Sequence, residues 1–241
     1  VNPDCGYVYS ANNAPEPRDS LHYPGHYYSG NTRAAGIVEA LSASKTDWTV
    51  AEVQAIQLDH YSRVYPKNTA LMVTMAEQAG ESVESFMKNW SGSHFGHDIA
   101  PTLYYRWMYR TIEAAMADEF AQAATDGTAG EKFEAFHKTI VSENSFPRLL
   151  AHPNSPWWDD VRTDTKESAS DIVASALRAA RVDLQVTLGE DTAEWRYDRL
   201  HTVTHRHAMA SVPIVGDWLS VGGIPLPAAK DALNKYEFKL K

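Results

Sequence analysis

The pattern of hydrophobic and polar positions changes twice along the chain. From about residue 31 onward, apolar side chains recur every three or four positions, which is the period of an amphipathic helix. In the segment 31–44 this stripe consists of Ile37, Val38 and Leu41. The same period predicts further helices over 70–79, 82–90, 101–124, 132–141 and 166–188. The middle of the chain is therefore predicted to be a helical lobe.

Two helix starts carry local signals. Thr49 and Glu52 have the spacing of a capping box, in which each side chain bonds the other residue's backbone N–H. Pro101 suits a first helical turn, where its missing N–H would have no partner in any case. Between the later helices, a long connecting loop is predicted from Pro147 to the tandem Trp157 and Trp158. This pair is expected to anchor packing rather than to bind a substrate.

The two ends of the chain have a different texture. Residues 6–11 form a short strand candidate, and the prolines at 15 and 17 predict a loop, because proline cannot join a strand ladder. After Gly189, valines among glycines and prolines predict short strands and turns. We therefore expect an α+β chain whose ends share one sheet. Its three blocks are the strand and loop block 1–31, the helical lobe 32–190 and the strand-rich block 191–241.

Composition excludes some classes of function. The formal net charge of −9 and the pI of about 5.5 argue against nucleic-acid binding, which needs clustered lysine and arginine. No apolar run is long enough to cross a membrane. A single cysteine, Cys5, rules out an intrachain disulfide framework. Val1 is not an initiator methionine and no signal peptide follows it, so we expect a processed or excised chain.

Histidines and carboxylates supply weaker candidates for chemistry. His201, His205 and His207 would share one face of a strand, and three imidazoles could bind zinc. No Cys, Asp or Glu lies inside this cluster, so hydrogen bonding around a strand is the favoured interpretation. Cys5 lacks the sequence context of a nucleophile. The adjacent carboxylates, Asp118 with Glu119 and Asp159 with Asp160, are interpreted as solvated faces.

The N-terminal block has the clearest motif. The sequence from Asn2 to Pro15 places Gly6-Tyr7 before an Asn12-Asn13 turn that is closed by proline, and Arg33 opens a helix further on. This arrangement resembles the long subunit of the penicillin acylase family. Three later blocks are similar to that family in the same order: 56–62, then 195–201 with 206–207, then 222–225 with 231–234. No single block would be specific, but four in order are.

The resemblance implies a fold and a reaction. The fold would be part of the four-layer αββα sandwich of N-terminal-nucleophile hydrolases, with a large helical lobe. The reaction would be hydrolysis of an N-acyl amide through an acyl-enzyme on an N-terminal serine. Asn12 would donate to the oxyanion, and Arg33 would orient Asn12. An uncharged NH₂ donor stabilises a developing negative charge, and an arginine fork can hold the carbonyl oxygen of the same amide.

The resemblance also implies partners. Val1 cannot act as the nucleophile, so the chain is expected to be active only with other chains of the same precursor, one of them beginning with serine. The substrate would be a small N-acyl amide, of the kind hydrolysed by penicillin or acyl-homoserine-lactone acylases, and the location periplasmic or secreted. No cofactor is expected. The family often binds a structural calcium, but His22 occupies the matching position and Asp19 is the nearest aspartate, so any calcium is expected elsewhere.

Two alternatives remain open at this stage. The chain could be a catalytically inactive scaffold or binding relative that keeps the fold. It could also be a metal-dependent hydrolase built on the histidine strand. The residues that bind substrate are not indicated by the sequence.

Overall fold

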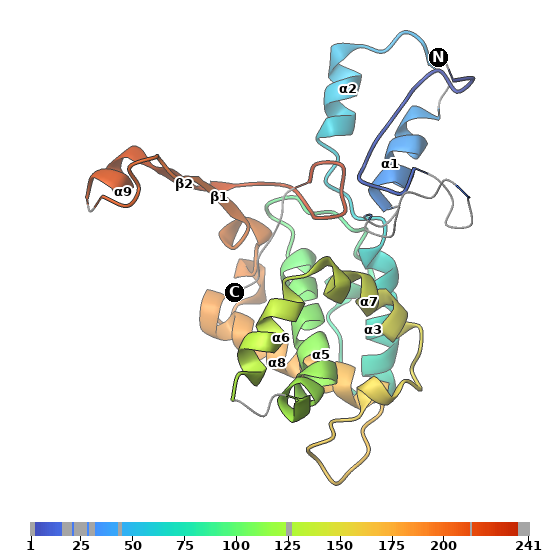
Figure 1. Ribbon diagram of the computed structural model, residues 1–241, viewed down its shortest axis with the longest axis vertical. Helices are drawn as coiled ribbons and strands as arrows, with labels where there is room; N and C mark the ends of the chain where they lie inside the picture. Colours follow the sequence, from blue (N-terminus) through green and yellow to red (C-terminus); the bar gives the residue numbers. More distant parts are fainter. Residues whose placement is uncertain are drawn as a thin grey trace.

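A computed structural model describes residues 3–15, 21, 28, 32–42, 45–123, 127–212 and 214–235. Its main body is a helical lobe (Figure 1). Two helices, α1 and α2, lie above this lobe with the N-terminal segment, and a thin arm that carries β1, β2 and α9 extends to one side. Among the described residues, no helix is both long and apolar enough to cross a membrane.

The described elements follow one another in this order along the chain. The α-helices are α1 (Thr32–Leu41), α2 (Val50–Gln57), α3 (Tyr65–Gln78), α4 (Ser85–Lys88), α5 (Ala100–Ala123), α6 (Ala129–His137), α7 (Ile140–Leu150), α8 (Ala169–Leu188) and α9 (Val215–Leu219). Short 3-10 helices are η1 (Pro156–Trp158), η2 (Thr192–Glu194) and η3 (Tyr197–Arg199). The strands are β1 (Thr202–His205) and β2 (Val221–Pro225).

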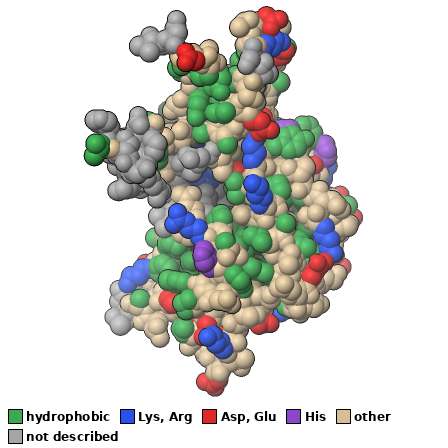
Figure 2. All heavy atoms as spheres, turned by 90° about the vertical axis from the view of Figure 1, so that its right-hand side faces the viewer, with side chains coloured by type: hydrophobic (Ala, Val, Ile, Leu, Met, Phe, Trp, Pro, Cys, Tyr) green, Lys and Arg blue, Asp and Glu red, His purple; other side chains and the backbone are tan. Residues whose placement is uncertain are grey.

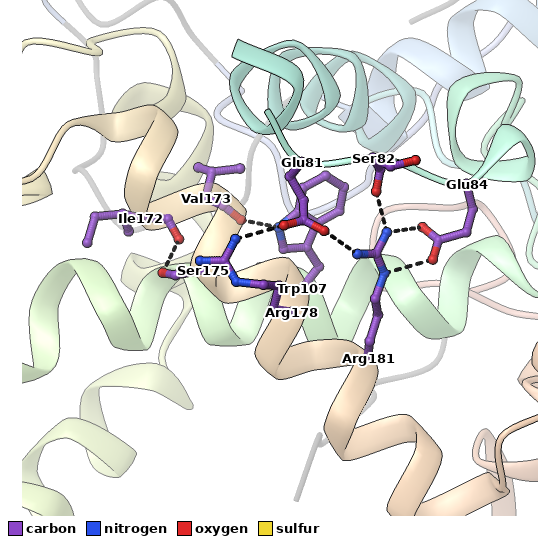
Figure 3. Close-up of polar contacts among 9 residues, drawn as sticks. All are labelled: Glu81, Ser82, Glu84, Trp107, Ile172, Val173, Ser175, Arg178 and Arg181. Atoms are coloured by element: carbon purple, nitrogen blue, oxygen red, sulfur yellow. Dashed lines mark hydrogen bonds and ion pairs between the residues drawn. The ribbon is translucent and has the colours of Figure 1, made fainter. Parts of the chain in front are cut away.

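Helix α5 is the centre of the hydrophobic core. It packs against α8 and α6, while α3 packs against α8 from the other side. Trp107 of α5 is fully buried, and its indole Nε1 donates to the carbonyl oxygen of Val173 in α8 over 2.8 Å (Figure 3). This bond satisfies the one polar atom of a large buried side chain and fixes the contact between the two longest helices.

A network of ion pairs fastens the α3–α4 connection to α8. Arg181 donates to Glu81 over 2.6 Å and to Glu84 over 2.8 Å, and Arg178 donates to Glu81 over 2.7 Å (Figure 3). The charged groups of Glu81, Glu84 and Arg181 are only about one-fifth exposed, so solvent screens them less than it screens an ordinary surface pair. The network therefore stabilises the register of α3 on α8.

The structure confirms the predicted helical lobe and both helix starts. Thr49 and Glu52 form the full capping box of α2, and Pro101 lies in the first turn of α5. The segment 132–141, predicted as one helix, is instead divided. Thr139 has extended backbone angles as the N-cap of α7, and this conformation ends α6 before α7 begins.

Three predicted non-helical or extended segments are wrong. Pro147 lies inside α7 and not in a loop, because burial of Phe146, Leu149 and Leu150 offsets the hydrogen bond that proline removes. Val215 begins α9 rather than a strand, and the segment 222–225 lies in β2 rather than in a turn. Residues 6–11 form no strand, because no described residue pairs with them.

The described sheet has two strands. β1 and β2 pair antiparallel, with Thr202 opposite Pro225, Val203 opposite Ile224 and His205 opposite Val221. Both strands come from the block 191–241, so the sheet expected to join the two chain ends is not formed by the described residues. The class is a mixed, mainly helical α+β chain.

A glycine contact supplies the first testable prediction. Gly92 has a φ of +89°, and a Cβ there would lie 2.2 Å from the Ser62 carbonyl oxygen. Gly80 has a φ of +80° but no atom within 4 Å of its Cβ position. In the assembled protein Gly80→Ala should cost about 1–2 kcal/mol, the cost of left-handed backbone, and Gly92→Ala at least about twice as much. Melting temperatures test this, and equal losses would contradict the contact.

Candidate active site

Asn12 and Arg33 meet although 21 residues separate them. The Nη2 atom of Arg33 donates to the Oδ1 atom of Asn12 over 3.1 Å. A guanidinium only donates hydrogen bonds, so the amide must turn its oxygen toward Arg33 and its NH₂ group away. Among the described residues, none accepts a hydrogen bond from that NH₂ group, and Asn12 is exposed. The pair therefore presents an oriented, unoccupied donor at the surface.

Asn13 has a different task. Its Oδ1 atom accepts from the Ala11 backbone N–H over 3.2 Å, and its Nδ2 atom donates to the Ala14 carbonyl oxygen over 3.2 Å. Both ends of this amide are thus used within the turn. Of the two adjacent asparagines, Asn13 holds the backbone and Asn12 points outward.

The backbone at Asn12 is held in an uncommon conformation. Its φ is +59°, which places it in the left-handed region. Asparagine tolerates this region better than other residues that carry a side chain, although less well than glycine. The neighbouring Ala11 is fully buried, which fixes the turn from the inside. Strained turns of this kind often occur at functional sites, where the surrounding structure determines the direction of a side chain.

Arg33 is positioned by α1, as its second residue. Two residues of this helix are buried, Ala34 and Gly36. Gly36 faces the guanidinium of Arg63, which also forms ion pairs with Glu39 over 2.8 Å and with Asp59 over 2.9 Å. Partial burial lowers the pKa of Arg63, but its bonds to Glu39 and Asp59 outweigh this and raise the pKa above its ordinary value.

Segments far apart in the sequence meet where Arg63 is anchored. We call this region the junction; it comprises residues 59–63, 92–98, 195–201 and 226–234. The backbone N–H of Asn234 donates to the Asp59 carbonyl oxygen over 2.8 Å, and the Ser62 hydroxyl donates to Asp231 over 2.8 Å. Three of the blocks predicted to carry the family resemblance therefore contact one another or a common neighbour.

The buried face of the junction is aromatic. His94 is fully buried and contacts the rings of Tyr65, Tyr105 and Tyr197. Its Nδ1 lies 2.8 Å from the Gly92 carbonyl oxygen and its Nε2 lies 3.3 Å from the Tyr105 hydroxyl. Burial lowers the pKa of His94 to about 4, so the ring is neutral near pH 7.

The histidine strand takes part in this packing. His201 is buried, stacks on Tyr197 with ring centres 4.6 Å apart, and its Nδ1 lies 2.7 Å from the Leu226 carbonyl oxygen. His205 and His207 are exposed. Within the described part of the chain, no group of three or more His, Cys, Asp or Glu side chains could hold a metal ion. His201 is therefore a hydrogen-bonded structural residue, as the favoured interpretation states.

The paired carboxylates differ from their predicted role. Asp118 is buried, not solvated, and accepts from the Val161 backbone N–H over 2.7 Å. Burial and the neighbouring Asp118 raise the pKa of Glu119 to about 7. Asp160 is half-buried and paired with Arg162 over 2.7 Å. The amphipathic pattern could not show that the loop 159–167 covers this end of α5.

Two cavities open on the described surface. A cleft of about 440 Å³ lies between α1, α2 and the segment 58–63. An apolar pocket of about 410 Å³ is lined by side chains of α5, α6 and α7 and by Trp157. Trp157 is partly exposed there, whereas Trp158 is buried and donates to the His152 carbonyl oxygen over 3.0 Å. The predicted packing anchor is thus Trp158. On the face shown in Figure 2, charges of both signs are scattered, without a basic patch.

Comparison with known proteins decides the family. The sequence model described as penicillin amidase matches residues 1–241. The chain belongs to the penicillin amidase family. This confirms the resemblance drawn from the four motif blocks, which are spread along the chain as the family match requires.

Relatives within this family carry the name of one activity. The chain is 26% identical over 160 residues to acyl-homoserine lactone acylase QuiP of Pseudomonas aeruginosa, covering 66% of this chain and 18% of that protein. It is 41% identical over 100 residues to acyl-homoserine lactone acylase QuiP of Pseudomonas fluorescens, covering 42% of this chain and 12% of that protein. The chain thus matches less than one-fifth of the length of these curated relatives. Family membership supports an acylase or amidohydrolase.

Two residues named for the calcium prediction, Asp19 and His22, lie outside the described residues, as does Val1. Sequence reasoning missed Arg63, Gly36 and the burial of His94. Arg63 directly follows the block 56–62 and lies four residues after Asp59, a spacing that favours an ion pair. That spacing was the available signal.

The buried His94 predicts a dependence of stability on pH. Its folded pKa of about 4 lies below the ordinary 6.5, so the unfolded chain binds the proton more readily. The stability that neutral His94 contributes is complete above about pH 6.5 and is lost progressively as the pH falls toward 4. His94→Asn can keep the bond to Gly92 without titrating.

The measurement is the fall in melting temperature of the assembled protein between about pH 7 and about pH 5. The fall should be smaller in His94→Asn than in the wild type, whatever the variant's starting stability. Parallel curves for the two proteins would contradict the assignment.

Proposed function

We propose that this chain supplies the oxyanion-stabilising part of an N-acyl amide hydrolase. The observation that carries the proposal is the Arg33–Asn12 hydrogen bond, which leaves the Asn12 NH₂ group oriented and without a described acceptor. A donor held in place before the reaction stabilises a developing oxyanion without reorganising. Family membership supplies the reaction class.

The proposed reaction proceeds in two steps. An N-terminal serine, carried by another segment, attacks the amide carbonyl carbon while its own α-amine accepts the hydroxyl proton. The carbonyl oxygen becomes an oxyanion, to which the Asn12 NH₂ group donates. The C–N bond then breaks, the amine leaves with the proton, and an acyl ester remains on the serine. Water hydrolyses this ester and releases the carboxylic acid.

The proposal extends to assembly and substrate. The chain matches 18% of the P. aeruginosa relative, so the nucleophile and most of the substrate pocket would come from other chains of the same precursor. Together they would form the four-layer sandwich, in the periplasm or outside the cell. The names of the relatives favour acyl-homoserine lactones as the substrate class.

Asn12 and Asn13 give a matched pair of variants for the test. In the assembled enzyme Asn12→Ala should lower kcat by roughly 10² to 10³, the usual cost of one oxyanion donor, and change KM much less. Asn13→Ala should act through the turn and cost on the order of 1 kcal/mol of stability. Arg33→Ala should resemble a milder Asn12 loss, because it frees the amide to rotate. Side-by-side values of kcat, KM and melting temperature distinguish these roles.

A near-normal kcat in Asn12→Ala would contradict the oxyanion role. If Asn13→Ala abolished turnover instead, the two asparagines would have exchanged roles. Residues 1–241 alone should not turn over an acyl amide, and activity that survives stringent purification of this chain would contradict the need for a partner.

A further inference from the structure

Helix α1 carries Arg33 but has little packing of its own. The extensive helix contacts of the described chain lie among α3 to α8, and α1 is not part of them. In Figure 1 it lies above the helical lobe beside α2. The cleft of about 440 Å³ that Ala40 lines with α2 residues shows that these two helices are not close-packed along their length. Something other than a hydrophobic interface must fix α1.

The guanidinium of Arg63 lies directly against the backbone of α1. A Cβ built on Gly36 would lie 2.9 Å from Arg63 Cζ, 3.0 Å from Nη1 and 3.1 Å from Nε. Real Cβ atoms do not approach other atoms this closely without displacement. Gly36 therefore has the role of admitting the guanidinium, in a helix whose propensity it lowers by about 1 kcal/mol relative to alanine.

Arg63 is held on both sides of this contact. Its Nε donates to Glu39 of α1 over 2.8 Å, and its Nη2 donates to Asp59 of the junction over 2.9 Å. Asp59 is itself fixed, because its Oδ1 accepts from the Tyr61 backbone N–H over 2.9 Å and its carbonyl oxygen accepts from Asn234. A planar fork that pairs with two carboxylates has one orientation, so the guanidinium cannot easily move away from Gly36.

We propose that Arg63 is a positioning residue for the oxyanion donor. It fixes α1 against the junction through Gly36 and Glu39, and α1 in turn places Arg33, which orients Asn12. This inference rests on the proposed function of Asn12. It assigns a role to residues that contact neither the substrate nor the reacting atoms.

Gly36→Ala gives a test in which activity and stability change in opposite directions. The added methyl group displaces α1 from Arg63, so kcat in the assembled enzyme should fall by roughly tenfold, with a smaller change in KM. The gain in helix propensity should keep the melting temperature at or near the wild-type value. A purely structural contact would instead lower stability and leave kcat unchanged. Gly130→Ala in α6 is the control, because no atom lies within 4 Å of its Cβ position, and kcat should not change.

Arg63→Ala completes a double-mutant cycle. It should lower kcat as well, and Gly36→Ala added to it should cause little further loss, because the clash partner is absent. Losses that multiply would contradict a shared mechanism. If Arg63→Ala does not assemble, Gly36→Ala alone decides the matter: an unchanged kcat would overturn the inference.

Asn12→Ala measured in parallel separates the two proposals. If it lowers kcat by roughly 10² or more while Gly36→Ala and Arg63→Ala do not, the positioning role fails and the oxyanion role stands. If Asn12→Ala leaves kcat unchanged, the proposed function itself fails.

Discussion

A guanidinium donates hydrogen bonds and accepts none, and this constraint organises the candidate site. The bond from Arg33 fixes the oxygen end of the Asn12 amide, so the donor end must face outward. The left-handed backbone at Asn12 and the use of Asn13 within the turn make the arrangement rigid. A charged donor in the same place would carry a counter-ion or a hydration shell, whereas the amide is neutral until an oxyanion develops.

The fold is arranged so that this turn can be held at a distance. The helical lobe buries α5 between α6 and α8, and the junction beside it gathers residues 59–63 with the C-terminal segment 226–234. Arg63 then connects the junction to α1 by ion pairs rather than by a hydrophobic interface. Charged pairs with planar geometry specify direction more sharply than apolar packing does. The aromatic packing around His94 supplies the stiffness behind them.

Local signals were readable from the sequence, and long-range ones were not. The capping box at Thr49 and the first-turn Pro101 depend on neighbouring residues alone, and both are confirmed. The strand predicted over residues 6–11 failed because a strand needs a partner, and Pro147 lies in a helix because tertiary burial outweighs its local cost. Asn12 and Arg33 could be named from a motif, and the bond between them agrees with the predicted geometry. Gly36 could not, because its neighbour Arg63 is brought to it only by folding.

The most direct measurement is a crystal structure of the assembled enzyme with an acyl boronate bound to the nucleophile, since a tetrahedral boronate oxygen occupies the place of the oxyanion. The account predicts Asn12 Nδ2 within about 2.7–3.1 Å of that oxygen, with Asn12 Oδ1 still accepting from Arg33 Nη2. An Asn12 amide that faces away from the boronate, or an oxygen bound by other donors alone, would contradict it.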